Sequence, residues 1–130
     1  MKIESQCCSL ELAQKLKELG VKQDAHFSYF LNGGEYSGAI VDTAMYSETD
    51  EEYKKDKLIS AFTSADLGEM LPWGVMVDGK MEALTFYKDS ADQWNFLPRH
   101  GAWYKSFNEI EADARALMLI YLIENKLITT

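Results

Sequence analysis

The sequence has little of the chemistry on which most catalytic and metal sites depend. Its 130 residues include two histidines, His26 and His100, which stand far apart in the chain. A serine-hydrolase triad needs a histidine beside its nucleophile, and no G-x-S-x-G motif occurs. The glycine-rich loops that bind phosphates or dinucleotides are also absent. We therefore predict a protein that is not an enzyme and that uses no cofactor or metal ion.

Cysteine is equally scarce, and the two cysteines, Cys7 and Cys8, are neighbours. Adjacent cysteines rarely reach the geometry of a disulfide bond with each other. Further metal ligands would have to come from the distant histidines. We expect two reduced thiols packed at the edge of the first helix.

Long apolar runs and a basic surface are missing too. No stretch approaches the roughly 20 apolar residues of a membrane span, and the opening MKIESQCCSLEL lacks the core of a signal peptide. The chain has 13 Lys and Arg against 21 Asp and Glu, a net charge of -8. This balance argues against direct binding to nucleic acid or to a membrane, and it favours a cytoplasmic protein. No linker divides the chain, so we expect one globular domain at residues 1–130.

The elements in the first half of the chain are well marked. A helix is predicted at residues 9–20, with Ser9 as its cap and Gly20 at its end. An antiparallel hairpin follows, in which the turn sequence NGGE joins strands at residues 25–31 and 36–41. The predicted apolar stripe of the helix consists of Leu12, Ala13, Leu16 and Leu19.

The middle of the chain begins with an acidic segment. Residues 42–56 hold six carboxylates against two lysines, which is typical of a solvated loop or a short exposed helix. A short helix is predicted within residues 58–72, where Thr63 and Asp66 have the spacing of a capping box.

The last third combines strands with a long helix. Asp78 and Gly79 indicate a hairpin, and two further extended pieces flank Pro98. Asn108 and Glu111 then stand in capping-box register. The helix that follows contains ALMLIYLI, which is apolar almost all round and therefore predicts a helix covered by protein.

This order of elements, αββαββ(β)α, predicts the α+β class. Because most of the strands are joined by hairpins, we expect an antiparallel or mixed sheet of four or five strands. Three helices would pack against this sheet in an arrangement like an α/β/α sandwich.

One stretch, WNFLPRHGAWY, brings flat rings and nitrogen-rich side chains together around a turn. Aromatic rings stack on planar ligands, and an arginine can hold a phosphate or a carboxylate through two hydrogen bonds. The alternative is that the rings fill the core as strand residues. The ligand-binding candidates in this stretch are Trp94, Arg99, His100, Trp103 and Tyr104.

His26 is a sixth candidate, on a strand beside Phe27 and Tyr29. A lone histidine in such a strand is more often a half-buried, hydrogen-bonded side chain than a base. It would contribute to a site only if the fold brings it near Arg99 and His100.

Three stretches carry a resemblance to a known group of proteins. Together CSLELAQKLKELGVKQDAHFSYF, ISAFTSADLGEMLP and EADARALMLIYLIENKLI resemble small uncharacterised proteins encoded by bacteriophages and prophages. The order of elements is similar to that of the phage ABA-sandwich domain, in which a sheet lies between helices. The resemblance implies expression inside a bacterial host cell.

Small phage proteins of this kind often neutralise a host component. The resemblance therefore implies a non-catalytic binding protein that counters host defence by sequestering a small signalling ligand of the nucleotide type. Such pockets commonly lie in homo-oligomers, which we expect here. Two alternatives stay open: an acidic decoy that inhibits a host defence protein or nuclease, and a small enzyme acting on a nucleotide-like ligand.

Overall fold

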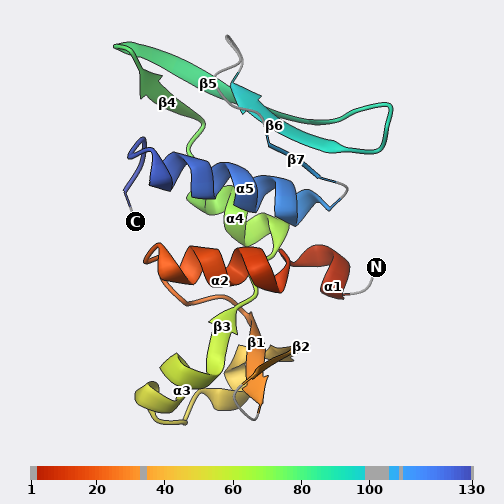
Figure 1. Ribbon diagram of the computed structural model, residues 1–130, viewed down its shortest axis with the longest axis vertical. Coiled ribbons are helices and arrows are strands. Elements are labelled where there is room, and N and C mark those ends of the chain that lie inside the picture. Colours follow the sequence, from red (N-terminus) through yellow and green to blue (C-terminus); the bar gives the residue numbers. More distant parts are fainter. Residues whose placement is uncertain (1–2, 33–34, 99–105, 109, 130) are drawn as a thin grey trace.

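The computed structural model of the protein describes residues 3–32, 35–98, 106–108 and 110–129. Within them the chain forms both helices and antiparallel sheets, so it belongs to the α+β class, as predicted (Figure 1). The helices are α1 (Ile3–Gln6), α2 (Leu10–Glu18), the 3-10 helix η1 (Thr43–Tyr46), α3 (Glu51–Lys57), α4 (Ser64–Met70) and α5 (Glu111–Glu124). The strands are β1 (Phe27–Asn32), β2 (Glu35–Asp42), β3 (Leu58–Ser60), β4 (Gly74–Val77), β5 (Lys80–Lys88), β6 (Trp94–Pro98) and β7 (Ser106–Asn108).

The strands that the structure describes make two sheets rather than one. Their orders are β2-β1-β3 and β4-β5-β6-β7, and every pairing is antiparallel. Figure 1 shows α2, α4 and α5 in the middle of the molecule, with one sheet on each side of them. The prediction of a single sheet between helices is therefore wrong, because here the helices lie between two sheets.

The character of α5 gives a physical reason for this arrangement. A helix that is apolar almost all round must be covered on more than one side. Ala116 and Leu119 of α5 pack into the main core with α2, α4 and the first sheet. Met118 and Leu122 instead pack against Val75 beneath the second sheet. One central helix thus takes part in two apolar clusters.

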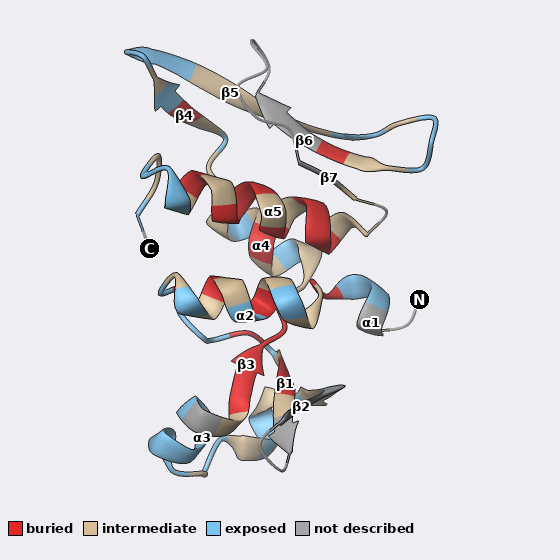
Figure 2. Ribbon diagram, in the orientation of Figure 1, coloured by how far each residue is buried: buried red, intermediate tan, exposed pale blue. Residues whose placement is uncertain are grey.

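Strand β3 is not predicted from the sequence. The residues LIS stand at the start of a predicted helical segment, because a short apolar run fits a buried helix as well as a strand. In the structure Ser60 pairs with Ser28 of β1, and all three residues of β3 are buried (Figure 2). The acidic segment before it forms η1 and α3, and the short exposed helix predicted as one of two outcomes is present in α3.

Most local signals in the sequence are confirmed. The Ser9 side chain accepts from the Leu12 N–H, and Gly20 has a φ of 90°, in the left-handed region. Thr63 forms a complete capping box at α4. Asp78 and Gly79, with φ of 50° and 80°, turn between β4 and β5 as a hairpin of this type requires.

The predicted cap of the last helix is wrong. The helix begins at Glu111, after Ile110, and none of the side chains that the structure describes caps it. The Asn108 side chain instead accepts from the Ile110 N–H, at 2.9 Å. An asparagine readily bonds the backbone two residues further on, and this turn competes with the capping box.

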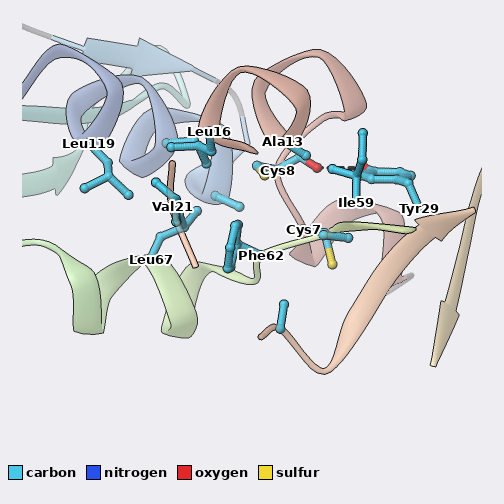
Figure 3. Close-up of a cluster of buried hydrophobic side chains, with 14 of the residues drawn as sticks. Cys7, Cys8, Ala13, Leu16, Val21, Tyr29, Ile59, Phe62, Leu67 and Leu119 are labelled. Atoms are coloured by element: carbon cyan, nitrogen blue, oxygen red, sulfur yellow. Dashed lines mark hydrogen bonds between the residues drawn. The ribbon is translucent and has the colours of Figure 1, made fainter. Parts of the chain in front are cut away.

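The main core lies around Phe62, as Figure 3 shows. It joins α2, α4 and α5 to β1 and β3 through Leu16, Leu67, Leu119 and other buried apolar side chains. Tyr29 belongs to this core and donates its hydroxyl hydrogen to the Cys8 carbonyl at 2.7 Å. Phe27 packs against the same core from a half-buried position.

Candidate ligand-binding site

Of the six predicted ligand-binding residues, the structure describes Trp94 and His26. The other four, Arg99, His100, Trp103 and Tyr104, lie outside the described residues. Their predicted role stays a prediction.

Trp94 opens β6 and has the contacts of a packed strand residue. Its ring is stacked on Phe86 of β5, with the centroids 5.1 Å apart and the planes within 10°. The Lys88 ammonium lies 5.7 Å from the same ring. The Arg115 guanidinium lies 4.3 Å from the centroid of the Phe86 ring. Contacts of this kind stabilise the packing of a strand side chain within its sheet.

His26 lies elsewhere in the fold. Its exposed side chain precedes β1, and its carbonyl accepts from the Thr43 N–H at 2.8 Å. β1 belongs to the first sheet and β6 to the second, and Figure 1 shows helices between the two sheets. His26 and Trp94 therefore do not share a site.

Both cysteines are buried thiols, as predicted. Cys8 is 0% exposed, and its burial, together with the nearby Asp113 carboxylate, raises the pKa of the thiol to about 12. A thiol with such a pKa stays protonated at neutral pH and is a poor nucleophile. Within residues 3–32, 35–98, 106–108 and 110–129, no three His, Cys, Asp or Glu side chains are grouped as metal ligands.

We predict that both thiols are inert in the folded protein, because the attacking species is the exposed thiolate. Dithionitrobenzoate at about pH 8 should release no colour from the native chain, and two equivalents after unfolding in urea. Rapid reaction of Cys7 or Cys8 without denaturant would contradict the buried positions.

A cavity of about 350 Å³ lies between the end of α2, the first sheet and α3, and we call it the α3 pocket. This volume is within the range of small-molecule sites. Its lining residues are Lys17, Gln23, Ser28, Thr43, Glu51, Glu52, Lys54, Lys55, Leu58 and Ser60. Most of these side chains are polar, so the pocket suits a polar ligand.

The buried part of the α3 pocket is formed by β1 and β3. Ser28 and Ser60 are 2% and 4% exposed, which places them at its floor. The hydroxyls of Ser28 and Thr43 lie 2.6 Å apart in a hydrogen bond. Ser60 Oγ accepts from the Ala25 N–H at 3.3 Å. The alternation of side chains along a strand is what turns these hydroxyls away from the Tyr29 side of the sheet.

Three lysines complete the walls. Lys17 Nζ reaches from α2 and donates to the carbonyls of Lys55 and Leu58, at 2.7 and 3.2 Å. A lysine on the last carbonyls of a helix stabilises that end, so Lys17 holds α3 in place. Lys54 Nζ lies 2.7 Å from Glu51 Oε1, and Lys55 is exposed at the mouth.

The net charge of the pocket lining is opposite in sign to that of the whole chain. Its lining holds three lysines against two glutamates, whereas the whole chain has a net charge of -8. These residues are not among the predicted site residues. The signal for them in the sequence is the pair Lys54 and Lys55 inside an otherwise acidic segment.

A second cavity, of about 290 Å³, lies beside α4, α5 and the C-terminal residues. Leu119, Ile123 and Ile128 give it a mainly apolar lining, and its one cation, Lys22, lies 3.9 Å from Asp24. It has fewer polar groups than the α3 pocket with which to orient a ligand.

Comparison with protein-family models, with curated proteins and with solved structures gives no match to this chain. In the described part of the chain, no helix has the length and apolar character needed to cross a bilayer.

Proposed function

We propose that the protein is a non-catalytic binding protein that sequesters a small anionic ligand of the nucleotide type in the α3 pocket. The observation that supports this proposal is the set of hydrogen-bond donors gathered there. The ligand's phosphate would lie against the floor hydroxyls and the wall lysines.

The donor inventory of the pocket favours an anion. A hydroxyl that accepts one hydrogen bond still has its own hydrogen to donate, which applies to Ser60. In the pair Ser28 and Thr43, one hydroxyl donates to the other, and the hydrogen of the acceptor stays available. Lys54 adds an ammonium at the wall, and bonds from such a group to a phosphate are stronger than neutral ones.

The resemblance to phage proteins gives the proposal its biological setting. In that setting the protein would act inside an infected bacterial cell and lower the free concentration of a signalling nucleotide that activates host defence. Sequestration needs affinity alone, which agrees with the predicted lack of catalysis.

Replacing Lys54 by glutamine should weaken ligand binding about tenfold to a hundredfold, because a hydrogen bond to a charged group is lost. Calorimetric titration with nucleoside monophosphates and cyclic dinucleotides would measure this effect. Lys57→Gln is the matched control, since it removes the same charge from the same helix at a position outside the pocket lining. Equal affinities for the two variants, or no binding to the wild-type protein, would refute the proposal.

The decoy alternative depends on different side chains. Glu48, Asp50, Glu51 and Glu52 are all exposed, as a decoy would require. Association with a basic host protein that weakens with added salt, and that survives Lys54→Gln, would favour this alternative.

A further inference from the structure

The α3 pocket has hydroxyl donors at its floor, and at its mouth it has two carboxylates beside the exposed Lys55 ammonium. Ser28 and Ser60 are buried at the floor, whereas Glu51 and Glu52 are exposed at the mouth on the first turn of α3. An ionised carboxylate can only accept hydrogen bonds. A ligand that fills the pocket would therefore need an anionic end and, at the other end, N–H donors.

The two carboxylates at the mouth are not equivalent. Glu51 Oε1 already pairs with Lys54 Nζ at 2.7 Å. The Glu52 backbone N–H donates to Asp50 Oδ1 at 2.7 Å, which fixes this residue on the first turn of the helix. Glu52 is therefore the better placed of the two to receive a ligand group.

Among the common nucleobases, guanine presents two neighbouring donors, N1–H and the N2 amino group, on one edge. A carboxylate can accept both at once, in the bidentate manner that it uses with arginine. Adenine sets an acceptor nitrogen beside its amino group, and uracil has one N–H between two carbonyl oxygens. Each of these would bring an acceptor against the carboxylate.

We infer that the α3 pocket prefers a guanine nucleotide, an inference that rests on the proposed function. The phosphate binds the floor hydroxyls and Lys54, and the Watson–Crick edge of the base faces Glu52. Glu52 is then the residue that determines base specificity, while Lys54 determines affinity for the phosphate.

Calorimetric titration with GMP, IMP and AMP tests this inference. IMP keeps the N1–H of GMP and lacks the N2 amino group. Wild-type protein should bind GMP about five to ten times more tightly than AMP, with IMP between them. A bidentate contact distinguishes bases less strongly when it is exposed to solvent, as it is at this mouth. Glu52→Gln should remove the preference and leave the affinity for AMP unchanged or slightly raised.

Glu48→Gln is the matched control, because Glu48 is exposed, lies in the same acidic segment and is outside the pocket lining. This variant should keep the preference for GMP. Equal binding of GMP and AMP by the wild-type protein, with both weakened by Lys54→Gln, would overturn the guanine preference and leave the proposed function intact. Failure of all three nucleotides and of the cyclic dinucleotides to bind would overturn both.

Discussion

Replacing Phe62 by alanine is expected to lower the free energy of unfolding by about 3 to 5 kcal/mol. The ring is 0% exposed and is the largest fully buried side chain among the described residues. Its removal takes apolar area out of the core and leaves a cavity that rigid neighbours cannot close. Since domains of this size are stable by only about 5 to 15 kcal/mol, much of the folded population would be lost on mild heating.

The position of Phe62 explains why neighbouring elements cannot move in to fill the space. Its carbonyl accepts from the Cys8 N–H at 2.9 Å, which ties the end of β3 to the segment before α2. The next residue, Thr63, is the cap of α4. The ring therefore lies where two helices and a strand are already fixed by hydrogen bonds.

Urea denaturation followed by circular dichroism would measure the change. Trp73→Ala is the control, because this ring is larger but 73% exposed, and it should cost about 0.5 kcal/mol or less. A loss below about 1 kcal/mol for Phe62→Ala would show that the core can collapse around position 62.

The parts of the fold that were predictable from the sequence are those set by neighbouring residues. The cap at Ser9, the capping box at Thr63 and the turn at Asp78 each depend on a few adjacent positions. The α+β fold class was predictable from the order of the helices and strands that these signals mark. The cap at Asn108 failed for a local reason as well, because two short-range hydrogen-bonding patterns compete for the same side chain.

The division into two sheets depends on pairings that local patterns do not contain. β3 is three residues long, and it joins the first sheet because Ser60 pairs with Ser28, far away in the chain. That pairing commits the first hairpin to one side of the helices. The apolar α5 then packs between this sheet and the second one.

The α3 pocket was hidden for the same reason. Lys17 and Lys55 are 38 residues apart, and only the fold brings the ammonium of one to the carbonyl of the other. Aromatic rings and histidines are chemically distinctive in any context, and the predicted site consists largely of them. Lysines and serines acquire meaning as a site only when several of them surround one cavity.

The Asp113 carboxylate should make stability depend on pH in a way that one substitution can isolate. Asp113 lies in the first turn of α5, is 6% exposed and accepts from the Ser9 N–H at 2.6 Å. Burial raises the pKa of this carboxyl above its ordinary value of 3.8, and the bond from Ser9 lowers it by less. Asp113→Ala should cost about 1 to 3 kcal/mol, because the partly buried Ser9 N–H loses its acceptor.

Asp113→Asn behaves differently, because the amide oxygen can still accept from Ser9 and carries no charge. A carboxyl whose pKa is raised by folding binds its proton more tightly in the folded state, so the wild-type protein loses stability as the pH rises from 3.8 through the folded-state pKa. The asparagine variant lacks this loss. Its free energy of unfolding relative to wild type should therefore increase over that pH range and be constant above it.

Urea titrations of wild type, Asp113→Asn and Asp113→Ala at a series of pH values would measure these differences. Subtracting the wild-type curve removes the contribution of other carboxyls that titrate in the same range. Because burial of a charge is the cause, the free energy of unfolding of the asparagine variant should increase relative to wild type toward neutral pH. The alanine variant should have a lower free energy of unfolding than the asparagine variant at every pH. If the free energy of unfolding of Asp113→Asn relative to wild type instead decreases as the pH rises, the Ser9 bond outweighs the desolvation of the carboxylate.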